Sequence, residues 1–188
     1  SNNMLDTLPN SGPEMDDTPL IGFPQDISRE IASVVERAVA EGSISIEEVF
    51  DTNYVPVEGT NPQQYWNRFC EFADRQVQPI LDRVMKQEGR AIAAVITDVN
   101  GYLPTHLSER SRPQSNDPEW NAANCRNRCN FADETTLKAA RSDKPVTLAA
   151  FCWDLGAERV TAKDAFVPLT IAGRRWGNFE LVYVDAAK

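Results

Sequence analysis

The stretch "DAFVPLTIAGRRWGNFELVYV", residues 164–184, contains two apolar segments on either side of a short polar turn. Both segments are rich in β-branched and aromatic residues, which favours strands, and Gly173 lies between them. The sequence therefore predicts an antiparallel hairpin made of residues 164–172 and 175–184. Gly177 interrupts the second segment, and a glycine inside a strand is typical of a bulge or of close approach by another backbone or a ligand.

Three further strands are predicted upstream. The run "AIAAVITD" (91–98) has the composition of a buried strand, and an Asn-Gly pair then predicts a tight turn into "YLPTHL" (102–107). The run "VTLAAFCWDL" (146–155) gives the last one. Short helices are expected between the second and third strands, at 117–128 with Asp117 as N-cap and at 133–143 with Asp133 or Thr135 near its start. The predicted fold class is α+β, with a five-stranded antiparallel sheet.

The region 26–88 is predicted to be a helical segment, and 89–188 the sheet domain. Apolar residues at helical spacing, together with Asp26 as N-cap and Gly42 as a stop, predict a first helix; the spaced residues are Ile27, Ile31, Val34, Val35 and Ala38. Ser45 and Glu48 form a capping-box pattern for a short second helix. Residues 1–25 are polar and acidic, which predicts a flexible leader.

A long helix is predicted over residues 61–88. Asn61 would be its N-cap and Pro62 its first helical residue, and a wide apolar face implies burial. Pro79 lacks the N–H that would bond the carbonyl of Arg75, so a kink is expected there.

The net charge of −9 excludes one class of partner. Residues 1–60 hold twelve acids and two bases, whereas residues 61–188 hold sixteen acids and seventeen bases. Because no basic face is evident, nucleic-acid binding is not expected. No apolar run approaches the ~20 residues of a membrane span and there is no signal-peptide pattern, so we expect a soluble, cytoplasmic chain without direct membrane insertion.

The four cysteines are expected to be free thiols, with Cys125, Cys129 and Cys152 filling gaps as small buried side chains. Two alternatives stay open for a cofactor, which is otherwise unknown. Cys125, Cys129, Cys152 and His106, the only histidine, have the chemistry of a tetrahedral metal site, and His106 alone has that of a haem ligand. No metal ligand is assigned. Because no nucleophile–base spacing is recognisable, no catalytic residue and no enzyme activity are predicted.

The run "EWNAANCRNR" (119–128) concentrates asparagines, two arginines and a tryptophan. Asparagine is a poor helix former, so solubility alone would favour Glu and Lys. Amides with guanidiniums suit a concave site for a small polar or anionic ligand. The alternative is a polar network that joins this helix to the preceding hairpin.

The runs "TDVNGYLPTH", "WNAANCRNR" and "GRRWGNFELVY" together resemble the PAS/Cache-like sensory domain of bacterial methyl-accepting chemotaxis proteins, the chemoreceptors. The resemblance extends over roughly residues 27–184. Leu107 and Cys129 stand where that family commonly has Asn and Arg. The long heptad-repeat hairpin of a chemoreceptor is absent from this sequence, which fits either an excised domain or a sensor that exists alone.

The resemblance implies a PAS-like sheet and a ligand-sensing function in signal transduction, with a small polar or anionic molecule bound between the sheet and the helices at 118–140. It places seven residues at or around the ligand: Tyr102, His106, Trp120, Asn124, Cys125, Arg126 and Asn127. The rival hypotheses are a redox, metal or haem sensor that uses His106 and the cysteines, and a dimerisation module without ligand. A homodimer through the N-terminal helices is expected in either case.

Overall fold

A four-stranded antiparallel sheet with the strand order β3-β6-β5-β4 forms the centre of the fold. The computed structural model describes residues 19–154 and 159–185. Its strands are β3 (Ala91–Asp98), β4 (Thr147–Asp154), β5 (Arg159–Ile171) and β6 (Arg174–Val184). The hairpin predicted from the sequence is confirmed as β5 and β6, which occupy the middle of the sheet and turn at Ala172 and Gly173, both with positive φ.

The fifth predicted strand, residues 102–107, does not join this sheet. The Asn-Gly turn is present, because the N–H of Asp98 donates to the carbonyl of Tyr102. Beyond it the chain pairs elsewhere: Leu103 N–H donates to the carbonyl of Cys129, and Arg128 N–H donates to that of Leu103. Pro104 has no N–H to extend a ladder along β3. The expected five-stranded, PAS-like sheet is therefore not confirmed.

One bulge connects the middle of the sheet to the core. Leu169 pairs with Gly177 and Thr170 with Arg175, which leaves Trp176 as an extra residue in β6. Trp176 is buried, and its indole N–H donates to the carbonyl of Val49 at 3.0 Å. A Cβ at Gly177 would lie 1.9 Å from the carbonyl oxygen of Thr97, so the close backbone approach predicted at this glycine is confirmed.

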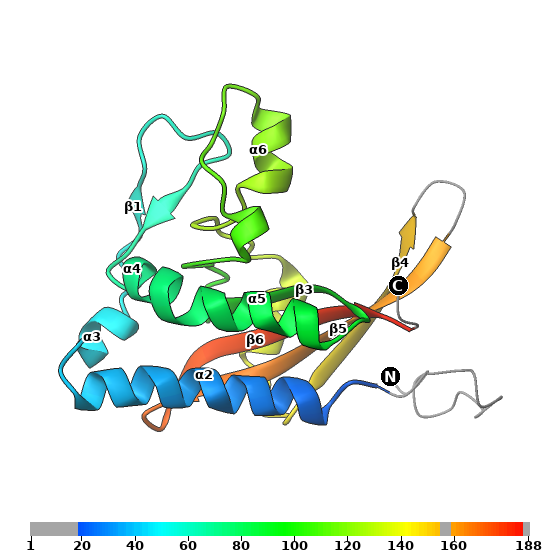
Figure 1. The fold of residues 1–188 in the computed structure, drawn as a ribbon, viewed down its shortest axis with the longest axis horizontal. Coiled ribbons are helices and arrows are strands. Elements are labelled where there is room, and N and C mark those ends of the chain that lie inside the picture. The colour runs from blue at the N-terminus through cyan, green and yellow to red at the C-terminus, as the bar shows by residue number, and fades with distance from the viewer. Residues whose placement is uncertain (1–18, 155–158, 186–188) are drawn as a thin grey trace.

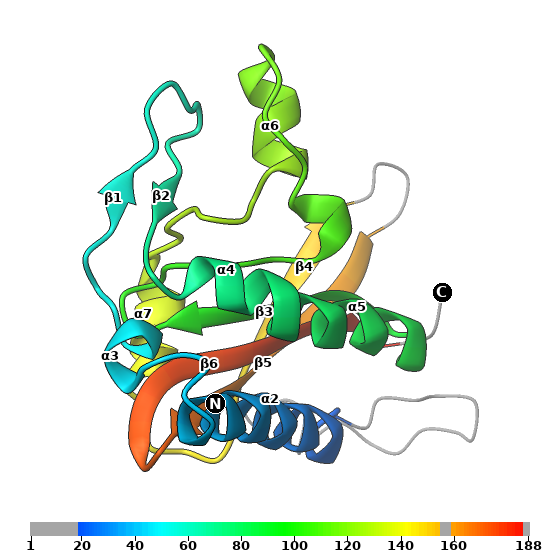
Figure 2. The same ribbon diagram turned by 60° about the vertical axis from the view of Figure 1, so that its left-hand side comes forward.

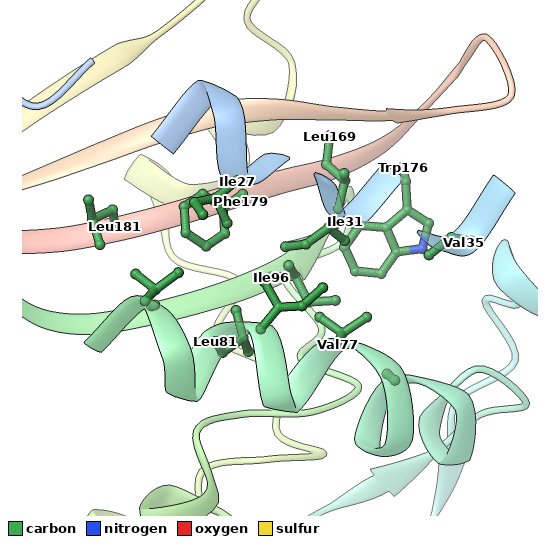
Figure 3. Close-up of a cluster of buried hydrophobic side chains, with 14 of the residues drawn as sticks. Ile27, Ile31, Val35, Val77, Leu81, Ile96, Leu169, Trp176, Phe179 and Leu181 are labelled. Carbon is green, nitrogen blue, oxygen red and sulfur yellow. The ribbon is translucent and has the colours of Figure 1, made fainter. Parts of the chain in front are cut away.

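Two helices cover one face of the sheet (Figures 1 and 2). They are α2 (Gly22–Ala40) and α5 (Gln78–Gln87). Figure 3 shows their apolar side chains meeting those of β3, β5 and β6; the labelled residues are Ile27, Ile31, Val35, Val77, Leu81, Ile96, Leu169, Trp176, Phe179 and Leu181, and all are buried. The predicted apolar stripe of the first helix is thus confirmed, and it packs within its own chain. The domain division at residue 88 stays a prediction, and the helical segment shares its core with the sheet.

The ends of α2 and of the short helix after it follow local rules. α2 begins at Gly22, before the predicted cap Asp26, and ends before Gly42, which has a φ of +80°. The capping box of Ser45 and Glu48 is confirmed at the start of α3 (Ile46–Val49).

The predicted helix start at Asn61 is wrong. Residues 65–66 instead form β2 (Tyr65–Trp66), which pairs with β1 (Val55–Pro56). The helix begins with α4 (Cys70–Phe72), whose N-cap residue is Phe69. Just before it, the side chain of Asn67 accepts the N–H of Phe69, a local hydrogen bond that competes with helix formation upstream. Tyr65 N–H is meanwhile taken by the carbonyl of Arg128.

The kink predicted at Pro79 stays a prediction, and the structure has a π-helical turn just before this residue. The turn covers Ala73–Val77, between α4 and α5. It immediately precedes the proline, whose missing N–H leaves the Arg75 carbonyl without its usual α-helical partner.

The remaining helices lie outside the core layer. They are a 3₁₀ turn at Ser108–Arg110, α6 (Pro118–Asn124) and α7 (Glu134–Ala140). The predicted N-caps Asp117 and Asp133 are confirmed. Figure 2 shows α6 and the β1–β2 hairpin extending beyond the β3 edge of the sheet. In the same view α7 lies behind the sheet. Within the described ranges, every helix is too short or too polar to cross a membrane.

Replacing Gly177 by alanine tests the close approach of β6 to β3. The added methyl would overlap the Thr97 carbonyl and lie 2.6 Å from the Cα of Asp98, both backbone atoms that cannot move independently. We expect Gly177→Ala to lower the free energy of unfolding by about 3 kcal/mol, the upper range for overpacking. Urea denaturation measures it. Gly22→Ala is the control, because nothing lies within 4 Å of its added methyl. Equal stability of the two variants would contradict the contact.

Candidate functional site

A cavity of about 460 Å³ lies on the sheet face opposite α2 and α5. Its floor consists of residues of β3 and β6 with Phe151 of β4. Its walls come from the segment 103–110, from Ala123 and Arg126 at the end of α6, and from residues 131–136 at the start of α7. The two segments that the sequence singled out, 97–106 and 119–128, therefore border the same cavity.

Strand alternation makes the floor polar. Phe179, Leu181 and Tyr183 of β6 point into the core, so Glu180 and Val182 face the cavity. Asn178 pairs with Thr97 of β3 on the same face, and Asp164 of β5 pairs with Val182. This face of the sheet thus carries a row of four polar side chains across three adjacent strands: Thr97 and Glu180, which line the cavity, and Asn178 and Asp164 beside them.

Three of these four side chains have a buried polar atom without a hydrogen-bond partner in the protein. The atoms are Oγ1 of Thr97, Nδ2 of Asn178 and Oδ1 of Asp164. Buried polar atoms are nearly always paired in folded proteins, and an unpaired one costs about 1–3 kcal/mol. The row therefore combines two groups that can donate, the Asn178 amide and the Thr97 hydroxyl, with acceptor oxygens, on the face that carries the cavity.

The carboxyl groups of Asp164 and Glu180 interact, and the pKa of each is raised. Burial raises the pKa of Asp164 well above its ordinary value, and the charge of Glu180 and their mutual hydrogen bond raise it further. Burial also raises the pKa of Glu180, although accepting that bond and the charge of Arg126 oppose the effect. Asp133 adds negative charge beside both groups. Asp164 is therefore the proton-bearing partner and Glu180 the acceptor.

His106 lies in the cavity wall as a neutral ring. Its Nδ1 accepts the N–H of Leu107 at 2.8 Å, which leaves the ring proton on Nε2. Burial lowers the pKa of His106 to about 3, and the charges of Arg126 and Arg110 lower it further. The imidazole is therefore uncharged at neutral pH and offers one donor.

The seven residues predicted to surround the ligand lie in different places. His106 and Arg126 line the main cavity. Arg126 lies over the ring of Phe131, 4.5 Å from its centroid, and burial lowers its pKa. Cys125 is buried and, with Arg126, borders a second cavity of about 320 Å³ next to Pro62 and Tyr65.

The other four predicted residues make contacts within the protein or face outward. The Tyr102 hydroxyl donates to the carbonyl of Tyr65. The backbone carbonyl of Asn127 accepts a hydrogen bond from the side-chain amide of Gln64, at 2.9 Å. Asn124 donates to the carbonyl of Trp120, whose side chain is 39% exposed. Ligand-binding roles for all seven residues stay predictions.

A polar network also exists in this region, as the alternative interpretation proposed. The amide of Asn121 donates to the carbonyls of Asn61 and Ser115. The guanidinium of Arg128 donates to both carboxylate oxygens of Asp74, at 3.0 and 2.8 Å. Some amides and guanidiniums of the 119–128 segment therefore connect it to neighbouring elements, while Arg126 borders the cavity.

Asp164 and Glu180 were missed at the sequence level, although a signal exists. Glu180 stands between Phe179 and Leu181 in a strand that is otherwise apolar. Alternation sends such a residue to the opposite face, and an acid there indicates a polar environment on that face. Asp164 carries the same signal at the start of the predicted strand 164–172.

All four cysteines are free thiols, as expected. Cys125 and Cys129 are buried, and burial raises the pKa of both thiols. Cys152 is exposed, so the expectation of a third small buried thiol is wrong. In the parts of the chain that the structure describes, no group of three or more His, Cys, Asp or Glu residues is placed to hold a metal ion. Haem ligation by His106 stays a hypothesis.

No family model and no curated protein matches this chain. Among solved structures, it is similar to the ligand-binding domain of the Campylobacter jejuni chemoreceptor Tlp3 in complex with L-valine, at 11% identity and a TM-score of 0.40, covering 87% of this chain and 59% of that one. The Tlp3 sensory domain with isoleucine bound gives 13% identity, a TM-score of 0.37 and coverage of 87% and 59%.

An extracellular ligand binding receptor from Desulfohalobium retbaense is also similar, at 9% identity and a TM-score of 0.38. The aligned region covers 89% of this chain and 26% of the receptor chain. The chain thus spans between about a quarter and three fifths of these structures. Similarity at this level assigns neither a family nor a ligand.

The buried neutral state of His106 has a measurable consequence for stability. Its folded pKa of about 3 lies below the unfolded value of about 6.5, so on acidification the unfolded chain takes up a proton that the folded chain does not. The stabilisation is complete above pH 6.5 and is lost as the pH falls; at pH 5 the loss is about 2 kcal/mol. We expect chemical denaturation to show this loss of stability in the parent but not in His106→Gln. The buried carboxyl groups contribute equally to both proteins, so their opposing effect cancels in the difference between the two.

The ring itself can be followed by NMR, because the chain has a single histidine. A Cε1–H resonance that stays constant from pH 8 to about pH 5 is expected from the lowered pKa. A titration near pH 6.5 would show that the ring is solvated and would contradict its burial in the cavity wall.

Proposed function

We propose that this chain is a ligand-sensing domain of a chemoreceptor-like protein, and that it binds a small polar molecule in the cavity between the sheet and the segments 103–110 and 123–136. The supporting observation is the cavity itself, whose lining includes Thr97 with a buried hydroxyl that has no partner, together with Glu180, Arg126 and the neutral ring of His106. A concave site with a few convergent polar groups and shifted pKa values is the usual form of a small-molecule site.

The cavity walls are attached to the helix that includes α4, the π-helical turn and α5. Arg128 forms an ion pair with Asp74 in the π turn. The amide of Gln78 donates to the carbonyl of His106 at 2.9 Å. Asp82 accepts from the backbone N–H of Ser108 at 2.9 Å and from its hydroxyl. The three helix residues are spaced by four, so they lie close to one stripe of the helix.

This attachment provides the route for a signal. A ligand that draws His106 and Arg126 toward the floor moves the wall segments 106–108 and 126–128, which are hydrogen-bonded to the stripe of Asp74, Gln78 and Asp82. The π turn is an irregular part of the helix, and such turns are frequent at functional sites. We therefore propose that the ligand shifts the packing of this helix on the sheet at the turn preceding Pro79.

Filling the cavity tests the position of the site. Ala123 lines the main cavity and its neighbour Ala122 lines the second one, and both are exposed residues of α6. The parent is screened by isothermal titration calorimetry against a panel of polar metabolites. We expect Ala123→Phe to weaken binding of the identified compound at least about tenfold, equal to ~1.4 kcal/mol, and Ala122→Phe to leave it unchanged. The reverse result would move the site to the second cavity, and unchanged binding by both variants would exclude both.

Hydrogen exchange tests the route. With the identified compound at saturation, we expect slower or faster amide exchange in residues 73–87 than without it, because their packing shifts. In the double variant Gln78→Met and Asp82→Asn, the change in this helix should fall by half or more while cavity residues such as Val95 respond as before. A response of the helix that is independent of these two side chains would contradict the route.

A further inference from the structure

We propose that the ligand of this cavity carries a cationic N–H group, an amine or an amidine, which binds the Asp164–Glu180 carboxyl pair. This inference rests on the proposed function and specifies the chemistry of the same site. The carboxyl pair is defined by strand register: Asp164 pairs with Val182, and Phe166 pairs with Glu180, so the two acids are diagonal neighbours on one face of β5 and β6.

The two central strands hold the acids in place. β5 and β6 are each paired along both edges, so neither backbone can shift to separate the carboxyl groups. Apart from the interaction within the pair, Oδ1 of Asp164 is buried without a hydrogen-bond partner, and Glu180 lines the cavity. The pair therefore offers lone pairs that only a donor can satisfy.

Among the residues that the structure describes, no cationic side chain fills this role. Arg126 acts on Glu180 through its charge, but its guanidinium lies over Phe131 and donates to the carbonyl of Ala122 at 3.1 Å. In the described parts of the chain, neither acid has an ion-pair partner within 4.0 Å. Arg110 and the neutral His106 also line the cavity. The acids are therefore held together by the proton that Asp164 carries.

An entering cation can replace that proton. Burying a carboxylate without a partner costs free energy. A cationic N–H group that lies between the two acids can hydrogen-bond both and offset this cost for each of them. The proton is then released to solvent. An anion at the same place would meet Glu180 and Asp133, both negative, so the floor discriminates against anions by repulsion. Asn178 and Thr97 next to the pair can hydrogen-bond a polar remainder of the ligand.

Three probes of nearly equal shape separate the possibilities: benzamidine, benzamide and benzoate, which are cationic, neutral and anionic at pH 7.5. Each is titrated calorimetrically into the full chain. We expect benzamidine to bind at least about tenfold more tightly than benzamide, and benzoate not to bind up to about 10 mM. Repeating the benzamidine titration in phosphate and in Tris, whose ionisation heats differ, should show release of a proton.

The variants Glu180→Gln and Asp164→Asn keep the shape of each side chain and remove its charge. Either one should weaken benzamidine binding at least about tenfold and abolish the proton release. Glu119→Gln is the matched control, because Glu119 is an exposed acid of α6 outside the cavity. Circular dichroism of each variant verifies that it is folded. Affinity for benzamidine should rise with pH, because deprotonation of the carboxyl pair precedes binding, and should level off above the raised pKa of the pair.

Two results overturn the inference. Benzamidine binding that is absent in the parent, or that is unchanged in both variants, removes the carboxyl pair as a cation site. Preferential binding of benzoate that depends on Arg126 also overturns it, while leaving the proposed function intact. The proposed function fails separately, if no polar metabolite shows binding that Ala123→Phe weakens.

Discussion

The pairing of β5 with β6 determines what each face of the sheet can do. Once Phe166 pairs with Glu180 and Val167 with Phe179, alternation sends Phe179 and Leu181 under α2 and α5 and sends Glu180 to the opposite side. A shift of one residue would bury Glu180 among aliphatic side chains and expose Phe179. The hydrophobic core and the polar floor are thus two results of one register, and the core stabilises the placement of two acids that by themselves are unfavourable to bury.

The local parts of this fold could be predicted from the sequence. The stripe of α2, the capping box at Ser45, the caps Asp117 and Asp133 and the β5–β6 hairpin depend on residues within a turn or two of each other, and all are present. The wrong predictions concern segments whose backbone groups are hydrogen-bonded to residues far away in the sequence. Residues 102–107 look like a strand, and the beginning of that segment pairs with 128–130; residues 61–66 look like a helix start, and Tyr65 is hydrogen-bonded to Arg128.

The predicted site residues separate for the same reason, and their ligand-binding roles stay predictions. The resemblance to the sensory domains indicated His106 and Arg126, and both line the cavity. Tyr102 and Asn127 were chosen with them, and their hydrogen bonds are made to Tyr65 and Gln64. Composition indicates which side chains are suited to polar contacts, but the partner of each is decided by tertiary structure. Asp164 and Glu180 become neighbours only when the register of two strands is known.

Arg128 shows how the polar segment serves both the cavity and the helix beside it. Its φ of +65° is unusual for a residue with a side chain, and the conformation is supported by contacts in three directions. Its carbonyl accepts from Tyr65, its guanidinium bonds the carbonyl of Pro104, and the same guanidinium pairs with Asp74 in the π turn. Because Arg126, two residues earlier, borders the cavity, any movement of that wall is opposed or favoured by the helix at Asp74. In the proposed signalling route, a factor that stabilises the helix arrangement favoured by the ligand would by linkage also strengthen binding of the ligand.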